Sequence, residues 1–265
     1  MQHRVSQPVV SDPCKHGGMK SDSPRTAVVT GASSGIGEAT AYRLAEEGFE
    51  LVLGARRLDR LREVAAKCGA KAYELDVTDK SSIRAFCERI ESCNVLINNA
   101  GLASGFEPVT SLSEERLRVM WETNVLGLIW MTQALHDRLV ASGNGHVVNV
   151  GSIAGREVYP GGGGYTTSKH AVRVLTETMR VEWAGEPVRI TEVAPGLVET
   201  EFSVVRFDGD LAKAKKPYEG IEPLTATDIA DCIAWAVTRP PRVNIDEIVV
   251  KPVRQATATH VVRDL

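Results

Sequence analysis

The chain has 265 residues, of which 43% are hydrophobic and 5% aromatic, and its formal net charge is −3. So small a charge gives no electrostatic reason to expect nucleic acid or an anionic membrane surface as a partner. Its apolar runs all fall short of the roughly 18–20 residues that a membrane-spanning helix needs, and residues 1–25 lack the apolar core of a signal peptide. We therefore expect a cytoplasmic protein whose partner is a small-molecule substrate.

The first part of the chain differs in composition from the rest. Residues 1–24 combine Pro, Ser, Gly, His and charged residues without periodicity, which is typical of a disordered leader. Met19 is an alternative start, so the residues before it are either native or an upstream extension. From residue 25 to residue 265 no linker-like stretch interrupts the pattern described next, and we interpret this part as a single domain.

Short β-rich runs alternate with helix-length stretches, such as 37–48 and 59–69, whose apolar residues recur three and four positions apart. The central runs are almost continuously apolar, as expected for parallel strands that are covered on both faces. The pattern predicts an α/β fold, a Rossmann-type doubly wound parallel sheet of about seven strands with helices on both faces. The predicted strands are residues 26–30, 50–55, 71–77, 94–101, 146–152, 189–196 and 247–253.

The five cysteines give no sign of a disulfide framework or a metal site. Their number is odd, and their spacings match neither a metal-binding pattern nor a Cys-x-x-Cys pair. A chain of this length also has no need of covalent cross-links to build a core. We expect reduced thiols and no bound metal at Cys14, Cys68, Cys87, Cys93 and Cys232.

Between the first predicted strand and the next helix lies the glycine-rich stretch TGASSGIGEAT. Gly31 would allow a sharp turn, Gly35 would let the backbone approach a pyrophosphate, and Gly37 would let the helix pack closely on the sheet. The helix N-terminus would offer unpaired N–H groups to the phosphates. Since the stretch follows a strand and opens a helix, we interpret it as a dinucleotide-binding loop, and a glycine-rich turn without a ligand is the weaker alternative.

Tyr165 and Lys169, in the sequence YTTSK, are four positions apart and would share one face of a helix. Alone, the pair is typical of an exposed amphipathic helix. A tyrosine with its usual pKa of about 10 is a poor acid or base, but a nearby ammonium group and a positively charged nicotinamide would favour the phenolate. The alternative interpretation, a proton-transfer pair, therefore requires a cofactor site elsewhere in the chain.

Six sequence marks follow one another in order through nearly the whole chain after the leader. They are TGxxxGxG at 30–37, NNAG at 98–101, Asn124 in ETNVLG, Ser152 in VGSIAG, the Tyr165–Lys169 pair and PG at 195–196. In this combination the chain resembles the short-chain dehydrogenase/reductase superfamily.

The resemblance implies a dinucleotide-binding catalytic domain over residues 25–265 and a role for each of four side chains. Tyr165 would be the acid/base, and Lys169 would lower its pKa and hold the nicotinamide ribose. Ser152 would hydrogen-bond the substrate's carbonyl oxygen and stabilise charge as it forms. Asn124 would hold a water that connects Lys169 to solvent.

The choice of cofactor depends on the end of the second predicted strand. An NAD-binding protein needs an acid there for the ribose 2′-hydroxyl, whereas this chain has Arg56 and Arg57. Two guanidinium groups suit the dianionic 2′-phosphate of NADP(H), and Ser33 is placed to add a hydroxyl contact. The alternative, in which the arginines only solvate a helix start, is disfavoured by the helix dipole.

The resemblance extends the cofactor site to further positions. It implies that Asp76 and Val77 contact the adenine, although Asp76 could also cap a helix that begins near Asp79, and the two roles are compatible. The complete predicted cofactor site is Gly31, Ser33, Ser34, Gly35, Ile36, Gly37, Arg56, Arg57, Asp76, Val77, Asn99 and Gly101 on the adenosine side, and Tyr165, Lys169, Pro195, Gly196, Val198 and Thr200 toward the nicotinamide.

Residues 198–220, between the sixth predicted strand and the last helix, are expected to form a lid over the substrate. Their EFSVVRF stretch and residues 224–255 are similar to NADP-dependent 3-hydroxy acid (serine or allo-threonine) dehydrogenases and to clavulanic acid dehydrogenase-like reductases. The ITG…DGG ending of 3-ketoacyl carrier-protein reductases is absent.

This similarity implies hydride transfer between NADP(H) and a small hydroxy compound or carbonyl, either a 3-hydroxy acid or its semialdehyde. An aldehyde or ketone reductase of specialised, antibiotic-type metabolism is the alternative. A non-catalytic NADP-binding sensor is less favoured, because such members lose the tyrosine, lysine or serine, and all three are present here.

A hydroxy acid needs a cation for its carboxylate. Arg206 in the lid and Arg156 after the serine motif are the candidates, with Ser152 as the other substrate contact, although either arginine could be a solvated surface residue. The glycines at 161–164 leave little side-chain bulk beside Tyr165, which predicts an open and adaptable pocket mouth.

The resemblance also implies a homotetramer. Its interfaces would use the helix that carries Tyr165 and Lys169, the helix before it and the last strand. Residues 256–265 would pack across such an interface. A monomer and a dimer are the open alternatives.

Overall fold

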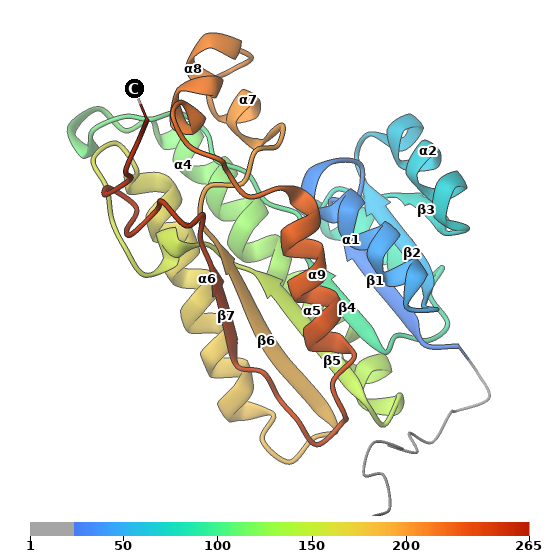
Figure 1. Ribbon diagram of the computed structural model, residues 1–265. Helices are drawn as coiled ribbons and strands as arrows, with labels where there is room; N and C mark the ends of the chain where they lie inside the picture. Colours follow the sequence, from blue (N-terminus) through green and yellow to red (C-terminus); the bar gives the residue numbers. More distant parts are fainter. Residues whose placement is uncertain (1–23, 265) are drawn as a thin grey trace, which may run out of the picture.

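The computed structural model describes residues 24–264, and in this range seven strands form one sheet (Figure 1). The strand order is β3-β2-β1-β4-β5-β6-β7, and every neighbouring pair is parallel. The strands are β1 (Thr26–Thr30), β2 (Glu50–Ala55), β3 (Lys71–Glu74), β4 (Val95–Asn98), β5 (Gly145–Val150), β6 (Val188–Pro195) and β7 (Glu247–Val250). The predicted doubly wound parallel sheet is confirmed. The leader expected over residues 1–24 falls, apart from its last residue, outside the described residues.

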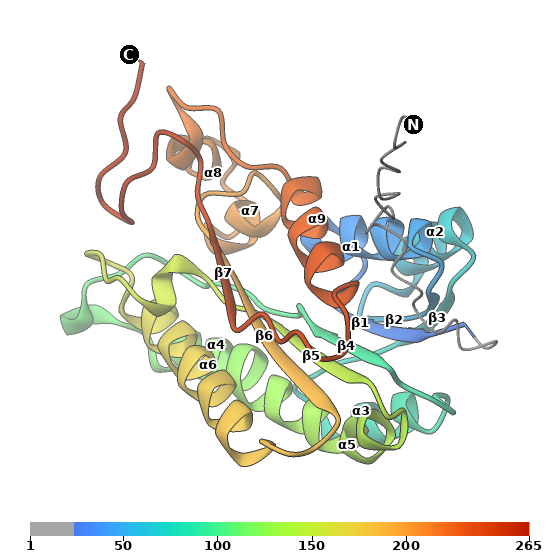
Figure 2. The ribbon, with the colours of Figure 1, turned by 60° about the horizontal axis from the view of Figure 1, so that its bottom comes forward.

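Helices cover both faces of the sheet, as Figure 2 shows in a view close to its edge. One face carries α1 (Gly35–Glu46), α2 (Leu58–Cys68) and α9 (Ala226–Val237). The other face carries α3 (Lys80–Cys87), α4 (Glu114–Trp121), α5 (Gly127–Ala141) and α6 (Gly163–Glu182). Three short helical turns lie between β4 and α6. They are η1 (Val109–Ser111), η2 (Glu122–Leu126) and η3 (Ile153–Gly155).

Each face of the sheet has its own apolar core, because successive side chains of a strand point to opposite faces. In β1, Val29 packs in the cluster that includes α1, α2 and α9, whereas its neighbour Val28 packs with α3, α5 and α6. The same alternation divides Val147 and Val148 of β5. Strands buried on both faces read as continuous apolar runs, which is why the sequence revealed them.

Five of the seven predicted strands end one to three residues earlier than expected, and two of them bear on the site. The strand predicted over 71–77 ends at Glu74, and the chain then turns at Asp76, whose carboxylate accepts hydrogen bonds from the backbone N and the Oγ1 of Thr78 at 2.9 and 2.7 Å. Asp79 caps α3 by accepting from Ser81 N at 2.8 Å. The expectation that Asp76 could cap this helix is therefore wrong. The strand predicted over 94–101 ends at Asn98.

Two segments lie over the carboxyl edge of the sheet, next to each other. The first holds α7 (Phe202–Arg206), α8 (Leu211–Lys215) and η4 (Lys216–Tyr218), within the predicted lid. The second is the C-terminal segment 255–264, which folds back on the lid of its own chain (Figure 1). There Asp264 N donates to Gly220 O at 2.9 Å, and Arg263 Nη2 donates to Pro217 O at 3.0 Å.

Three features of residues 24–264 concern membrane spans, disulfides and metal sites. No helix there has the length and apolar character needed to cross a bilayer. The cysteines in this part, Cys68, Cys87, Cys93 and Cys232, are free thiols. No group of His, Cys, Asp and Glu side chains in it is arranged to hold a metal ion.

Candidate active site

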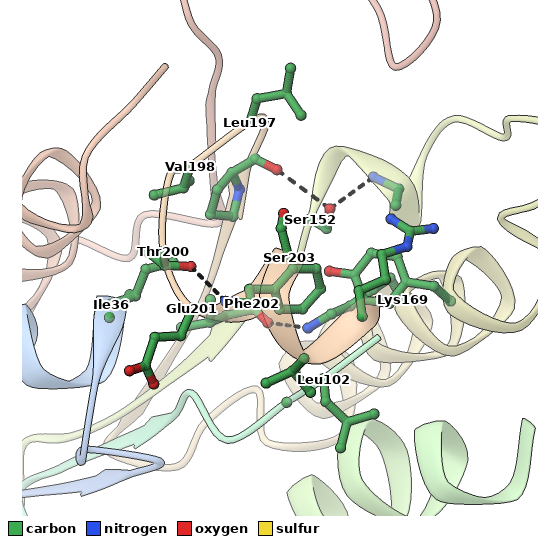
Figure 3. Close-up of a pocket in the computed structure, with 18 of the residues that line it drawn as sticks. Ile36, Leu102, Ser152, Lys169, Leu197, Val198, Thr200, Glu201, Phe202 and Ser203 are labelled. Atoms are coloured by element: carbon green, nitrogen blue, oxygen red, sulfur yellow. Dashed lines mark hydrogen bonds between the residues drawn. The ribbon is translucent and has the colours of Figure 1, made fainter. Parts of the chain in front are cut away.

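A cavity of about 860 Å³ lies at the carboxyl edge of the sheet, where the strand order turns from β2 through β1 to β4. Ligands of open α/β sheets bind at such a switch point. Of the predicted site residues, all line this cavity except Gly37, Asn124 and Arg156. Figure 3 shows part of it, with Ser152 and Lys169 among the lining side chains of Ile36, Leu102 and the segment 197–203.

The glycine loop has the backbone that its residues predicted. Gly31 and Gly35 have φ values of +65° and +57°, in the region that favours glycine. A Cβ on Gly37 would lie 2.4 Å from Asn99 Nδ2 and 2.5 Å from Gly31 O, so only glycine fits there. Asn99 Nδ2 in turn donates to Thr30 O at 2.9 Å, which ties the loop to the end of β4. Gly37 and Asn99 thus shape the loop.

Arg57 is held against this loop. Its guanidinium donates to Ser33 Oγ at 3.3 Å and to Ser34 Oγ at 2.6 Å. It also forms an ion pair of 2.8 Å with Glu201, which pairs with Arg60 as well, at 2.5 Å. These arginine hydrogen bonds lower the pKa of the Glu201 carboxyl.

Arg56 is exposed and lines the same cavity. Because Arg57 contacts Ser33, Ser34 and Glu201, its role is not limited to solvating the start of α2. The carboxylate of Glu201, a partner that sequence reasoning missed, comes from a segment more than a hundred residues further along the chain.

Tyr165, Lys169 and Ser152 meet at the other end of the cavity. Tyr165 and Lys169 lie one turn apart on α6 and are both buried, which excludes the exposed amphipathic helix. Ser152 follows β5, and its Oγ accepts from Ala154 N at 3.1 Å and donates to Pro195 O at 3.4 Å. Lys169 Nζ donates to Val150 O at 2.8 Å and lies 5.9 Å from the centre of the Tyr165 ring.

Burial dominates the titration of both groups on α6. It raises the pKa of Tyr165, while the nearby Ser152 hydroxyl and the charge of Arg206 act in the opposite direction. It lowers the pKa of Lys169 to about 8, against the opposing charge of Glu192. Burial thus holds the pKa of Tyr165 above its usual value, whereas the pairing with Lys169 predicted a lower one.

Asn124 lies behind the cavity in η2, a π-helical turn between α4 and α5. Its Nδ2 donates to Leu102 O at 2.8 Å and to Ser168 Oγ at 3.0 Å, and its Oδ1 accepts from Leu102 N at 2.8 Å. A Cβ at Gly101 would lie 3.2 Å from Asn124 Oδ1 and 3.6 Å from Lys169 Nζ, so both atoms flank Gly101. With both amide protons used, a water could bind Asn124 only at Oδ1.

The short chain dehydrogenase family model matches residues 25–210. The chain belongs to the short-chain dehydrogenase family. It is 51% identical over 243 residues to an uncharacterized oxidoreductase of Mycobacterium tuberculosis (strain ATCC 25618 / H37Rv), covering 90% of this chain and 97% of that protein. It is 44% identical over 251 residues to an NADP-dependent 3-hydroxy acid dehydrogenase of Schizosaccharomyces pombe, covering 90% and 96%. A closed serine dehydrogenase structure complexed with NADP+ matches with a TM-score of 0.86 at 36% identity, covering 91% and 100%.

In this short-chain dehydrogenase, Arg206 of the lid lies beside Tyr165. Its guanidinium lies 4.8, 5.5 and 5.7 Å from the ring centres of Phe106, Tyr159 and Tyr165. It donates to Gly105 O at 3.3 Å and to the Tyr159 hydroxyl at 3.2 Å. The predicted lid cation therefore lies within the cavity that holds Tyr165.

The other candidate cation lies elsewhere. Arg156 is bonded to Glu192 and Glu247 and does not line the cavity, so the expectation that it could bind a substrate carboxylate is wrong. Both carboxylates already satisfy its guanidinium.

The glycines at 161–164 also act differently from the expectation. A Cβ at Gly161 or at Gly162 would meet the rings of Phe106 and Tyr159 at 2.6 and 2.4 Å. The missing side chains thus make room for aromatic rings, and the predicted open mouth is wrong at these positions.

Sequence reasoning also missed two parts of the cavity wall. Phe202 packs edge-on against Tyr165, with ring centres 5.4 Å apart. The C-terminal segment contributes Gln255, Ala258, Thr259, Val261 and Arg263. No sequence motif marks either part.

Proposed function

We propose that the chain is an NADP(H)-dependent oxidoreductase that transfers a hydride between the nicotinamide and a small hydroxy compound or its carbonyl. A 3-hydroxy acid or its semialdehyde is the substrate class that we favour. The observation that carries the proposal is that Ser152, Tyr165 and Lys169 share one cavity with the glycine loop and Arg57. The NADP-dependent 3-hydroxy acid dehydrogenase and the serine dehydrogenase described above support both the cofactor and the substrate class.

The residues of the cavity fit this cofactor. Ser34 makes no capping hydrogen bond to α1, so its side chain leaves the first-turn N–H groups available to phosphate oxygens. Arg57, Ser33 and Ser34 form a cluster of donors beside the loop, which suits a 2′-phosphate. The bound nicotinamide supplies or accepts the hydride.

The chain's own residues would manage the proton. Tyr165, which burial keeps protonated, donates its hydroxyl proton to the substrate oxygen during carbonyl reduction and takes it back during alcohol oxidation. Ser152 donates a hydrogen bond to the same oxygen and stabilises its developing charge. Lys169, held on Val150 O, favours the phenolate once the proton has left, and Asn124 supports a relay from Lys169 to solvent.

Arg206 would bind the carboxylate of a hydroxy acid. Its hydrogen bonds within residues 24–264 use Nε and Nη2 and leave Nη1 for an external acceptor. The rings of Phe106 and Tyr159 hold the guanidinium in place from two sides. A carboxylate on Nη1 would place a short substrate next to the Tyr165 hydroxyl.

Two alternatives stay in view. The aromatic wall of Phe106, Tyr159 and Phe202 favours an uncharged aldehyde or ketone as substrate. The chain would then be a reductase of specialised metabolism. A non-catalytic NADP-binding sensor is less favoured, because Ser152, Tyr165 and Lys169 occupy one site.

We further propose a homotetramer in the cytoplasm. Large apolar side chains are exposed on the surfaces that the expected interfaces use, with Val174 and Val181 of α6 at 59% and 77% exposure and Val249 of β7 at 45%. Free thiols at Cys68 and Cys232 suit a reducing compartment. Light scattering of the purified chain gives the oligomeric state directly.

The experiment that tests the function follows the absorbance of the reduced nicotinamide with purified protein. The substrates are L-serine, L-allo-threonine, 3-hydroxyisobutyrate and 3-hydroxypropionate, each with NADP and with NAD. Turnover with NADP on these acids supports the proposal. Silence on all four, together with NADPH consumption on an aldehyde, moves the function to the specialised-metabolism alternative. If the protein turns over neither acids nor aldehydes but still binds NADPH, the result supports the non-catalytic NADP-binding sensor.

A further inference from the structure

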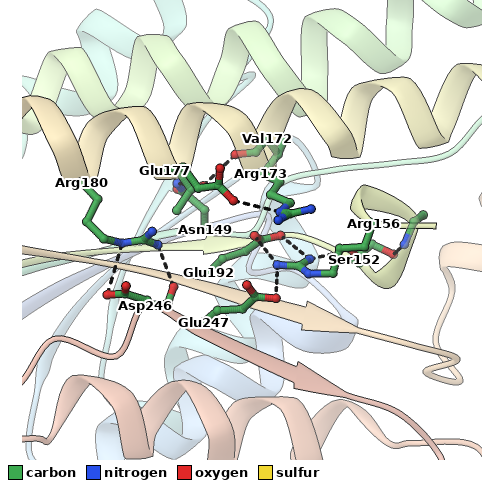
Figure 4. Close-up of polar contacts among 12 residues, drawn as sticks. Asn149, Ser152, Arg156, Val172, Arg173, Glu177, Arg180, Glu192, Asp246 and Glu247 are labelled. Atoms are coloured by element: carbon green, nitrogen blue, oxygen red, sulfur yellow. Dashed lines mark hydrogen bonds and ion pairs between the residues drawn. The ribbon is translucent and has the colours of Figure 1, made fainter.

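A buried ion pair lies directly behind the proposed catalytic serine (Figure 4). The two outer nitrogens of Arg156, which follows η3, contact the two carboxylate oxygens of Glu192 on β6 at 3.2 and 2.8 Å. The two side chains are only 16% and 3% exposed. Glu247 of β7 contributes a second carboxylate to the same guanidinium.

This pair is costly to bury. Removing two charges from water is repaid only by close, bidentate geometry, and apolar residues of similar size often give equal or greater stability. Glu192 lies on a strand whose neighbouring side chains, Thr191 and Val193, are fully buried. Fold stability alone therefore gives little reason for a carboxylate here.

The carboxylate reaches the backbone just before Ser152. A Cβ at Gly151 would lie 1.9 Å from Glu192 Oε1 and 2.8 Å from its carboxyl carbon, so the side chain occupies the space that any other residue at 151 would fill. Gly151 N also donates to Val193 O on the same strand, at 2.8 Å. This short stretch is thus fitted onto β6 and its glutamate.

The residues on either side of Gly151 are each held by a cation. Arg156 Nη1, which also binds Glu192, donates to Ser152 O at 3.4 Å. On the other side, Lys169 Nζ donates to Val150 O at 2.8 Å. Three consecutive residues of the chain are therefore each in contact with a charged side chain.

We propose that Glu192 and Arg156 are positioning residues that fix residues 150–152, so that the Ser152 hydroxyl is presented to Tyr165 and to the substrate oxygen. The inference rests on the proposed function, because it concerns the serine of that same site. Neither side chain touches the cavity, so each acts through the backbone that it holds.

Glu192 also acts on Lys169 by its charge. It raises the pKa of Lys169, in opposition to burial, which lowers it to about 8. Two other titratable or charged groups face Tyr165 and Lys169 on α6. They are Tyr159, which precedes that helix, and Arg206 of α7. Replacing Glu192 by an uncharged residue lowers the pKa of Lys169 further, so the ammonium is lost at lower pH.

The test compares Glu192→Gln, Arg156→Gln and the double variant with Arg180→Gln as a matched control. Arg180 lies on the same helix as Tyr165 and pairs with Asp246 at 3.4 Å, away from Ser152 (Figure 4). The readouts are NADPH affinity, and kcat and KM for 3-hydroxypropionate with NADP or for propionaldehyde with NADPH.

Glu192→Gln and Arg156→Gln should each lower kcat about 10- to 100-fold without changing NADPH affinity. The control Arg180→Gln should keep the wild-type kcat and NADPH affinity. The double variant should lose no more than the worse single variant, because the two residues act as a unit. In carbonyl reduction, the alkaline limb of kcat for Glu192→Gln should move down by about half a pH unit to one unit.

Arg156→Lys keeps the charge, and its single ammonium cannot hold Ser152 O and both carboxylate oxygens as a guanidinium does. If the glutamine variants do not fold, this folded variant should still lower kcat about threefold or more. Folded variants with wild-type kcat and an unmoved alkaline limb would overturn the inference. Failure of the proposed function is distinguishable, because the wild-type chain itself would then turn over neither probe.

Discussion

At one end of the cavity the candidate groups come from the glycine loop and from the end of the neighbouring strand, whereas at the other end they come from segments far apart in the chain. The glycine loop joins β1 to α1, and Arg57 follows the neighbouring strand β2. Around Tyr165, by contrast, the groups come from η2, the end of β5, α6, α7 and the C-terminal segment.

The two ends also differ in what holds them. The loop end is mostly backbone, and the side chains of Arg56 and Arg57 are exposed to solvent. At the Tyr165 end the side chains are held by contacts within the protein, as Arg206 is by aromatic rings and Lys169 by the backbone carbonyl of Val150. A substitution at the first end should therefore act on cofactor affinity alone, and one at the second end on turnover or on substrate binding.

Tyr165→Phe should have the largest effect. Removing the hydroxyl takes away the proton donor and leaves the ring's packing on Phe202 intact. We expect kcat to fall about 10³-fold, with NADPH affinity unchanged in a fluorescence titration. A variant that keeps wild-type turnover would show that the phenol has no part in the chemistry.

Arg57→Ala tests the other end. It removes a charged donor from beside Ser33 and Ser34, so NADPH affinity should fall about 10- to 100-fold. Affinity for NADH, which lacks the 2′-phosphate, should change less than about threefold. Arg62→Ala, an exposed arginine of α2 that pairs with Asp59, is the control and should leave both affinities as they are. Equal losses for the two cofactors would contradict the assignment of the phosphate site.

Arg206→Gln separates binding of an acid from binding of an aldehyde. The KM for a 3-hydroxy acid should rise about tenfold, because the carboxylate loses a charged partner. The KM for propionaldehyde, measured in the same series, should change about twofold at most. A similar rise for both compounds would mean that Arg206 only supports the packing of Phe106 and Tyr159.

Glu201→Gln should have the smallest effect, and in the opposite direction. The carboxylate of Glu201 shares Arg57 and Arg60, so it competes with a 2′-phosphate. Because the side chains of Arg57 and Glu201 are both nearly half exposed, we expect NADPH affinity to rise only about two- to fivefold. A fall in affinity would show instead that Glu201 orients the arginines for the phosphate.

The same difference between the two ends decided what the sequence could reveal. The loop could be predicted because Gly31 and Gly37 are required by local backbone geometry, which is written in adjacent residues. The central strands could be predicted because burial on both faces leaves an unbroken apolar run. Tyr165 and Lys169 could be paired because they lie one helical turn apart.

The rest depended on contacts between distant segments. The two carboxylates on Arg156 come from β6 and β7, so sequence alone left this residue as a free cation. The aromatic rings that fill the space over Gly161 and Gly162 include Phe106, more than fifty residues earlier. The pKa of Tyr165 could not be judged either, since the burial that raises it is a property of the folded chain.

The most direct test of the central claim is the transfer of a labelled hydride. L-serine or 3-hydroxypropionate carrying deuterium at C3 is incubated with NADP and the protein, and the reduced cofactor is examined by mass spectrometry. We predict that the wild-type chain produces deuterated NADPH and that Tyr165→Phe produces almost none in the same time. Unlabelled NADPH, or equal label with the phenylalanine variant, would contradict hydride transfer assisted by Tyr165.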